Sequence, residues 1–148
     1  MKFFSLIVLL LFSFGCEKKI DLGVHKIHWD RDMCVRCKMV VSDREYAVQT
    51  TDPTTGRTYY FDDIGCLILW FDEDKIAWAD KAKIWVTDKN TKEWIDAKTA
   101  LWSTTSITPM AFGFAAHKTG TEPKGEIISY EKIVKRSIEM EKIKKGIR

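Results

Sequence analysis

Residues 34–39, with the sequence Cys-Val-Arg-Cys-Lys-Met, hold three sulfur atoms that could bind a metal ion. Thiolate and thioether sulfurs are soft ligands, and together they favour monovalent copper over zinc or iron. In an extended segment, side chains two residues apart point to the same side, so Cys37 and Met39 could bind one ion. The cationic neighbours Arg36 and Lys38 should lower the thiol pKa and favour the thiolate. The spacing therefore predicts a copper(I) site at Cys37 and Met39, with Cys34 close by.

The Cys-x-x-Cys pair allows three other interpretations. It could form a local disulfide bond. It could supply half of a structural zinc site, although zinc needs four ligands and the chain has no second Cys-x-x-Cys. It could also be a thioredoxin-like redox pair, which normally follows a buried strand, whereas residues 29–32 before it are polar. The sequence leaves these alternatives open.

Three more residues are candidate metal ligands. Met110 follows Pro109 at the start of a predicted buried strand, although a lone methionine more often fills a core. His117 lies just beyond that strand. Cys66 lies in a predicted apolar helix, where an inert buried thiol is the default interpretation, so it is the least certain of the three. The domain has three cysteines, which cannot all pair within the chain in an oxidising compartment.

The N-terminus has the pattern of an export signal. Lys2 precedes the apolar residues 3–14, a run too short for a membrane span of about 20 residues. Gly15-Cys16 then resembles the end of a bacterial lipobox. We therefore expect residues 1–15 to be a lipoprotein signal peptide and Cys16 to be acylated. Residues 16–31 would be a lipidated tether in the periplasm, on the inner or the outer membrane. Simple secretion and an uncleaved anchor are the alternatives.

Residues 32–148 have the pattern of one folded domain. Asp62 or Asp63 should cap a nearly all-apolar helix, and the last segment has apolar residues at helical spacing. The order of elements predicts a compact α+β fold built from β-β-α-β units, with a C-terminal amphipathic helix. The expected elements are strands at 46–51, 57–61, 83–87, 93–95 and 111–116, and helices at 64–74, 96–102 and 126–145.

The composition excludes some classes of function. The chain has 24 basic and 21 acidic residues, which gives no electrostatic case for nucleic-acid binding. It has no glycine-rich phosphate loop and no Ser-His-Asp signature. The Asp62-Asp63 pair already has a structural role as a helix cap. We therefore expect a binding protein and not an enzyme.

Four blocks of the sequence resemble the NosL-type lipoproteins, which are accessory proteins of nitrous oxide reductase. The resemblance spans residues 34–117, and the chain departs from it at Lys38 and Ala111, where glycine is common in the family. The blocks are Cys34-x-x-Cys37-x-Met39, residues 61–67 (Phe-Asp-Asp-Ile-Gly-Cys-Leu), residues 94–97 (Trp-Ile-Asp-Ala), and Thr108-Pro109-Met110 with residues 113–116 (Gly-Phe-Ala-Ala).

The resemblance implies a periplasmic lipoprotein that binds copper(I) and passes it to the maturing reductase through a membrane complex with an ABC transporter. The implied fold is a small α+β domain similar to part of organomercurial lyase. The family's copper ligands correspond to Cys37, Met39 and Met110, and Cys34 or His117 would complete the site. Two rival functions remain: a periplasmic thiol-disulfide protein that uses Cys34 and Cys37, and a copper-storage or carrier lipoprotein with another client.

Overall fold

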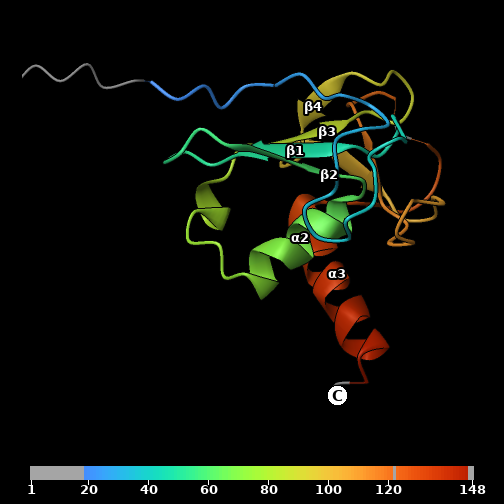
Figure 1. Cartoon of the computed structure of the whole chain (residues 1–148). Coiled ribbons are helices and arrows are strands. Elements are labelled where there is room, and N and C mark those ends of the chain that lie inside the picture. The colour runs from blue at the N-terminus through green and yellow to red at the C-terminus, as the bar shows by residue number, and fades with distance from the viewer. Residues whose placement is uncertain (1–18, 122, 147–148) are drawn as a thin grey trace, which may run out of the picture.

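The structure is a computed structural model that describes residues 19–121 and 123–146. It contains two antiparallel sheets and two α-helices, so the predicted α+β class is confirmed (Figure 1). The predicted signal peptide, residues 1–15, and the lipidation residue Cys16 lie outside the described residues. Within the described part of the chain, no helix combines the length and the apolar character needed to cross a bilayer.

The first sheet has four strands in the order β2-β1-β3-β4. Its first two strands form the hairpin that the proline and glycine of the intervening turn predicted. The Asp52 carbonyl accepts a hydrogen bond from the Gly56 N–H at 2.9 Å, and the Asp52 carboxylate accepts one from the Thr54 N–H at 2.7 Å. The strands are β1 (Val48–Thr51), β2 (Thr58–Phe61), β3 (Ile84–Thr87) and β4 (Trp94–Asp96).

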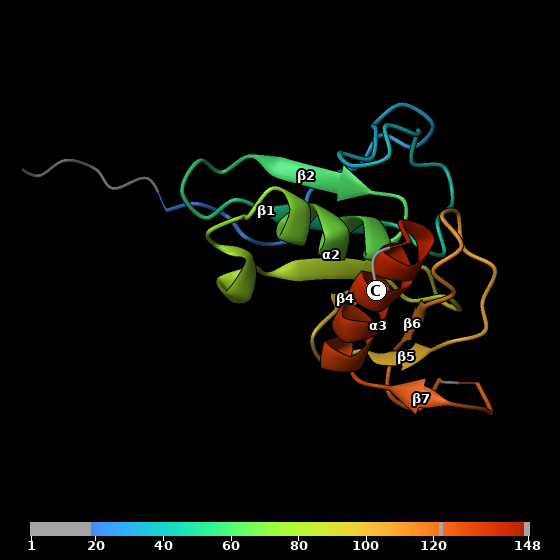
Figure 2. The ribbon, with the colours of Figure 1, turned by 90° about the horizontal axis from the view of Figure 1, so that it is seen from below.

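Helix α2 (Ile64–Glu73) follows β2 directly and lies across one face of this sheet (Figure 2). Asp63 caps it, because its carboxylate accepts a hydrogen bond from the Gly65 N–H at 3.0 Å. The first seven residues of the helix are all buried, as its apolar sequence predicted. The β-β-α-β order is confirmed for β1, β2, α2 and β3. Since Asp63 is the cap, Asp62 is left for another role.

The second sheet has the order β6-β5-β7, and here two predicted elements were wrong. The helix expected at 96–102 is a turn, because the Asp96 carboxylate accepts the Lys98 N–H and the chain then extends as β5 (Leu101–Ser103). The buried strand expected at 111–116 is only β6 (Ala115–His117), since Ala111 closes a turn onto Thr108. Trp102 pairs with residues of both neighbouring strands, and this long-range pairing overrides the local pattern.

The C-terminal helix α3 (Tyr130–Lys144) confirms the prediction, although it begins four residues later than expected. Ile127–Ile128 form β7 instead, which pairs with β5. Helix α3 packs against α2, with Ile133 fully buried (Figure 2). Helix α3 contacts both α2 and β5, so it joins the second sheet to the helix that lies on the first sheet.

The described part of the predicted tether is attached to the domain. Gln49 exchanges two hydrogen bonds with the backbone of His25, at 2.8 and 3.1 Å. The Trp85 indole N–H donates to the Leu22 carbonyl at 2.9 Å, and Ile27 is buried. Residues 22–27 of the predicted tether therefore pack on the folded domain.

Candidate metal centre

The loop that carries Cys34 and Cys37 is a tight turn held against β2, an edge strand of the first sheet. The Lys38 N–H donates to the Cys34 carbonyl at 3.0 Å, and the Cys34 N–H donates to the Met39 carbonyl at 2.8 Å. The Val35 N–H donates to the Tyr60 carbonyl of β2 at 3.0 Å. Lys38 has a φ of 62°, in the left-handed region, so residues 37–39 are not extended as the sequence argument assumed.

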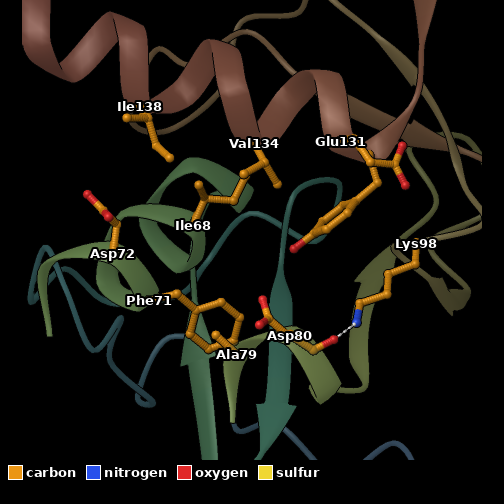
Figure 3. A pocket seen from close by; sticks show the side chains of 10 residues that line it. Ile68, Phe71, Asp72, Ala79, Asp80, Lys98, Glu131, Val134 and Ile138 are labelled. Carbon is orange, nitrogen blue, oxygen red and sulfur yellow. Dashed lines mark hydrogen bonds between the residues drawn. The ribbon is translucent and has the colours of Figure 1, made fainter. Parts of the chain in front are cut away.

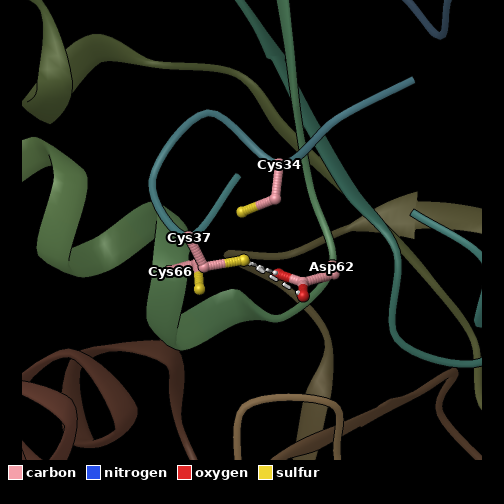
Figure 4. Close-up of side chains that lie close together, drawn as sticks. All are labelled: Cys34, Cys37, Asp62 and Cys66. Atoms are coloured by element: carbon pink, nitrogen blue, oxygen red, sulfur yellow. Dashed lines mark hydrogen bonds between the residues drawn. The ribbon is translucent and has the colours of Figure 1, made fainter. Parts of the chain in front are cut away.

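Four side chains from three elements meet behind this loop (Figure 4). Cys34 and Cys37 come from the turn, Asp62 follows β2, and Cys66 lies in the first turn of α2. Their ligand atoms all lie within 4.8 Å of one another. Cys34, Asp62 and Cys66 are buried, whereas Cys37 is partly exposed. Three sulfurs and one carboxylate oxygen in this arrangement could hold a metal ion, which would reach them past Cys37.

The four groups are already linked by hydrogen bonds. The Cys37 thiol donates to both carboxylate oxygens of Asp62, at 3.4 and 3.3 Å. A hydrogen bond from the Cys66 thiol lowers the pKa of Cys34 to about 7, against the opposing effect of burial, and backbone N–H groups add to the lowering. Burial raises the pKa of the Cys37 thiol to about 12, and the bond with Cys34 raises the pKa of Cys66. Cys34 is therefore the cysteine of this group that loses its proton most readily.

The predicted cause of the thiol pKa shift was wrong. The sequence suggested that Arg36 and Lys38 would stabilise thiolates, but Arg36 turns to helices α2 and α3. Its guanidinium binds both carboxylate oxygens of Glu73, at 2.8 and 3.0 Å, and one of Glu141 at 3.0 Å. Lys145 binds the same two carboxylates, at 3.1 and 3.0 Å. These four charges clamp the cysteine loop to the C-terminal helix.

The other predicted ligands lie outside the four-residue group. Met39 is 52 % exposed, and its N–H donates to the Cys37 sulfur. Met110 is partly buried and packs against the core. His117 is buried in β6, where its Nε2 lies 2.9 Å from the Ser103 hydroxyl. Among the described residues, Met39 thus lies on the cysteine loop, Met110 on the loop bound by Asp63, and His117 in the second sheet.

Asp63 holds the Met110 loop against the start of α2. Its carboxylate accepts from the Thr108 hydroxyl at 2.6 Å and from the Met110 N–H at 3.2 Å. Burial raises the pKa of this carboxyl, and the hydrogen bonds from Thr108 and the backbone act in the opposite direction. The same loop brings the Phe112 ring so close to Gly65 that a Cβ there would lie 2.2 Å from it. Asp63 therefore joins the loop to the helix that carries Cys66.

Two members of the group are weakly indicated by the sequence. The local pattern predicts only a helix cap for Asp62, and it makes Cys66 the least certain of the ligands. The cap needs one carboxylate, so a second aspartate beside it was the available signal for another role. For Cys66, the signal was its place in the first turn after that pair, on an element that follows β2 without a linker.

Away from the metal centre, a cavity of about 500 Å³ lies between α2, α3 and the 3₁₀ helix η1 (Ala79–Lys81). Figure 3 shows Ile68 and Phe71 of α2 across from Val134 and Ile138 of α3, with charged side chains on both sides of the cavity. The Lys98 ammonium there donates to the Asp80 carbonyl at 2.9 Å. This cavity has no sulfur ligand in its lining, so it is not part of the metal centre.

Comparison of the chain with protein-family models gives no match, and comparison with curated proteins gives none either.

Proposed function

We propose that this protein binds copper(I) with the thiolates of Cys34, Cys37 and Cys66 and carries it to a partner. The observation that supports this most directly is the meeting of these three sulfurs, from two separate elements, within 4.8 Å of one another. Thiolate sulfur is the ligand type that selects soft copper(I). The Asp62 oxygen is a hard ligand, so it acts here as the partner of the Cys37 thiol and not as a copper ligand.

Access to the group supports a carrier. Two of the three sulfurs are buried, and only Cys37 is partly exposed. A partner's sulfur can therefore replace ligands one at a time, beginning at Cys37. Met39 lies two residues further along the same loop and is half exposed, so we assign it as a weak additional sulfur ligand at the entrance of the site. Met110 and His117, which the sequence also predicted as ligands, have no role in this proposed three-thiolate site.

The backbone supports the resemblance to the NosL-type lipoproteins. The chain departs from that family at Lys38 and Ala111, where glycine is common. These residues have φ values of 62° and 60°, in the region that favours glycine. At both positions the backbone therefore has a conformation that glycine, the common residue of the family there, adopts without strain.

From the resemblance we propose a periplasmic lipoprotein, anchored through Cys16, that supplies copper for the assembly of nitrous oxide reductase. An ABC-transporter complex in the membrane would be its partner in this delivery. A copper-storage or carrier lipoprotein with another client would use the same site. The protein would have no catalytic activity of its own.

The three clustered sulfurs also favour a second candidate, thiol-disulfide exchange through Cys34 and Cys37. The two functions differ in their need for Cys66. Anaerobic copper(I) titration against a chromophoric competitor separates them, with the wild type compared with Cys66→Ser, Cys37→Ser and Met39→Leu. Met33→Leu is the matched control, because Met33 is as exposed as Met39 and borders the same loop.

For a copper carrier, we expect one tightly bound copper per chain, weakened strongly by Cys66→Ser and Cys37→Ser, moderately by Met39→Leu, and not by Met33→Leu. If Cys66→Ser binds copper as tightly as the wild type, and Cys34 and Cys37 form a reversible two-electron couple, the protein would be a redox protein instead. Preference for zinc(II) over copper(I) in the same competition would instead make the site a zinc site with Asp62 as its fourth ligand.

A further inference from the structure

A groove of about 420 Å³ lies between the loop after β5 and the end of α3. Met110 on the loop and Met140 on the helix both line it. The rest of its apolar lining comes from Ala111, Phe112 and Ile143. Two thioethers, separated by 30 residues in the sequence, therefore face one small apolar space.

The charged residues of the groove do not favour a hard cation. Glu141 lines it, but its carboxylate is bound by Arg36 and by Lys145, each at 3.0 Å. Lys144, the other charged residue in the lining, repels cations. The ligands that remain are neutral thioether sulfurs, which bind soft monovalent ions and bind magnesium, calcium or zinc poorly.

The two sulfur-bearing residues are held in different ways. Asp63 and the turn from Thr108 to Ala111, closed at 3.0 Å, fix the backbone of Met110. Met140 is 39 % exposed on α3, so it can be reached from solvent. One ligand is thus fixed in advance and the other is accessible, which suits an ion that binds and leaves.

The groove adjoins the thiolate group through two connections. Asp63, which binds the Met110 N–H, directly follows Asp62 of the group. Arg36, between the two cysteines of the loop, binds Glu141, which directly follows Met140. We propose that Met110 and Met140 form a second, thioether-only site for a soft monovalent cation, beside the thiolate centre. The proposal rests on the proposed function for its metal, copper(I), and on the groove for its ligands.

Silver(I), which does not change oxidation state in air, is the probe for this site. It is titrated into the full chain labelled with ¹³C at the methionine methyl groups, and the shifts are followed by NMR. We expect the first equivalent to go to the thiolates. A further equivalent should shift the Met110 and Met140 methyl signals along one common curve. Because two ligands act together, the silver concentration at the midpoint of that curve should be at least about tenfold lower than the concentration that shifts the exposed Met33.

Met140→Leu is the decisive variant, because leucine keeps the apolar volume and removes the sulfur. It should abolish the second binding event and the Met110 shift while leaving the first event unchanged. Met33→Leu is the matched control and should leave both events in place. Unshifted Met110 and Met140 signals at excess silver, or a Met110 shift that survives in Met140→Leu, would overturn the proposal. Failure of the thiolate site would remove only the first event, so the two failures are distinguishable.

Discussion

Replacing Arg36 by methionine should destabilise the protein and loosen the cysteine loop. Arg36 joins the loop to Glu73 at the end of α2 and to Glu141 on α3. Its side chain is 18 % exposed and that of Glu141 is 14 % exposed, so this ion pair is more protected than an ordinary surface pair. The substitution leaves both carboxylates with Lys145 as their remaining cation.

The magnitude follows from the Glu73 carboxylate. The Arg36 guanidinium, and after it the Lys145 ammonium that stays in the variant, lower its pKa from 4.5 to about 2 against the effect of burial. At about 1.4 kcal/mol for each pKa unit, this corresponds to about 3.4 kcal/mol. Glu73 is 35 % exposed, so solvent screening reduces this value, and Lys145 keeps its share of it, so we expect a loss of about 2 kcal/mol. For a domain of this size, the melting temperature should fall by about 8 °C.

The pH dependence has a defined sign. A carboxyl whose pKa is lowered by folding stabilises the protein above its unfolded pKa of 4.5, and this contribution is lost as the pH falls toward 2. The stability difference between wild type and Arg36→Met should therefore be full at pH 7 and small near pH 2.5. Urea unfolding followed by tryptophan fluorescence at both pH values measures it.

Arg136→Met is the matched control. Arg136 binds both oxygens of Glu126 with similar geometry, at 2.7 and 3.0 Å, but this pair lies on the surface and does not touch the loop. The control should therefore lose less stability than Arg36→Met. Equal losses for the two variants, or a loss for Arg36→Met that does not change with pH, would refute the view that the clamp is a protected ion-pair network.

Two further predictions concern the loop beside the site. Ala111→Gly should raise the free energy of unfolding by about 1 kcal/mol, because glycine adopts a φ of 60° without strain. The control Ala79→Gly in η1, where φ is not positive, should lower it by about the same amount. Thermal unfolding of the two variants measures both effects, and a loss of stability in both would contradict the prediction. Gly65→Ala should lower stability by about 2 kcal/mol, because the new Cβ would lie 2.2 Å from the Phe112 ring. Phe112→Leu should recover part of that loss in a double-mutant cycle, and additive effects would exclude the contact.

The parts of the fold that local patterns determine were predictable. The hairpin of β1 and β2 follows from its turn residues, and α2 follows from an aspartate cap before an apolar run. The second sheet was not predictable, because Trp102 extends to pair with Ala116 and Ile128, which lie 14 and 26 residues away. Residues 96–102 have a sequence compatible with a helix, and only those distant partners make the chain extend.

The candidate site was partly predictable for the same reason. The spacing of Cys34 and Cys37 is a local signal, and the sequence shows it. The approach of Cys66 depends on how the loop pairs with Tyr60 of β2, which no local pattern contains. Cys37 and Met39 would point to the same side only in an extended segment, whereas Lys38 between them is left-handed. A non-glycine residue in that conformation cannot be inferred from its type.

X-ray absorption spectroscopy at the copper edge tests the central claim most directly, because it counts the sulfur atoms bound to copper(I). For the protein loaded with one copper per chain, we predict a coordination shell of sulfur alone, with three thiolates. In Cys66→Ser the sulfur count should fall by one. A shell that contains oxygen or nitrogen in the wild type, or a sulfur count that Cys66→Ser leaves unchanged, would contradict a copper site built from Cys34, Cys37 and Cys66.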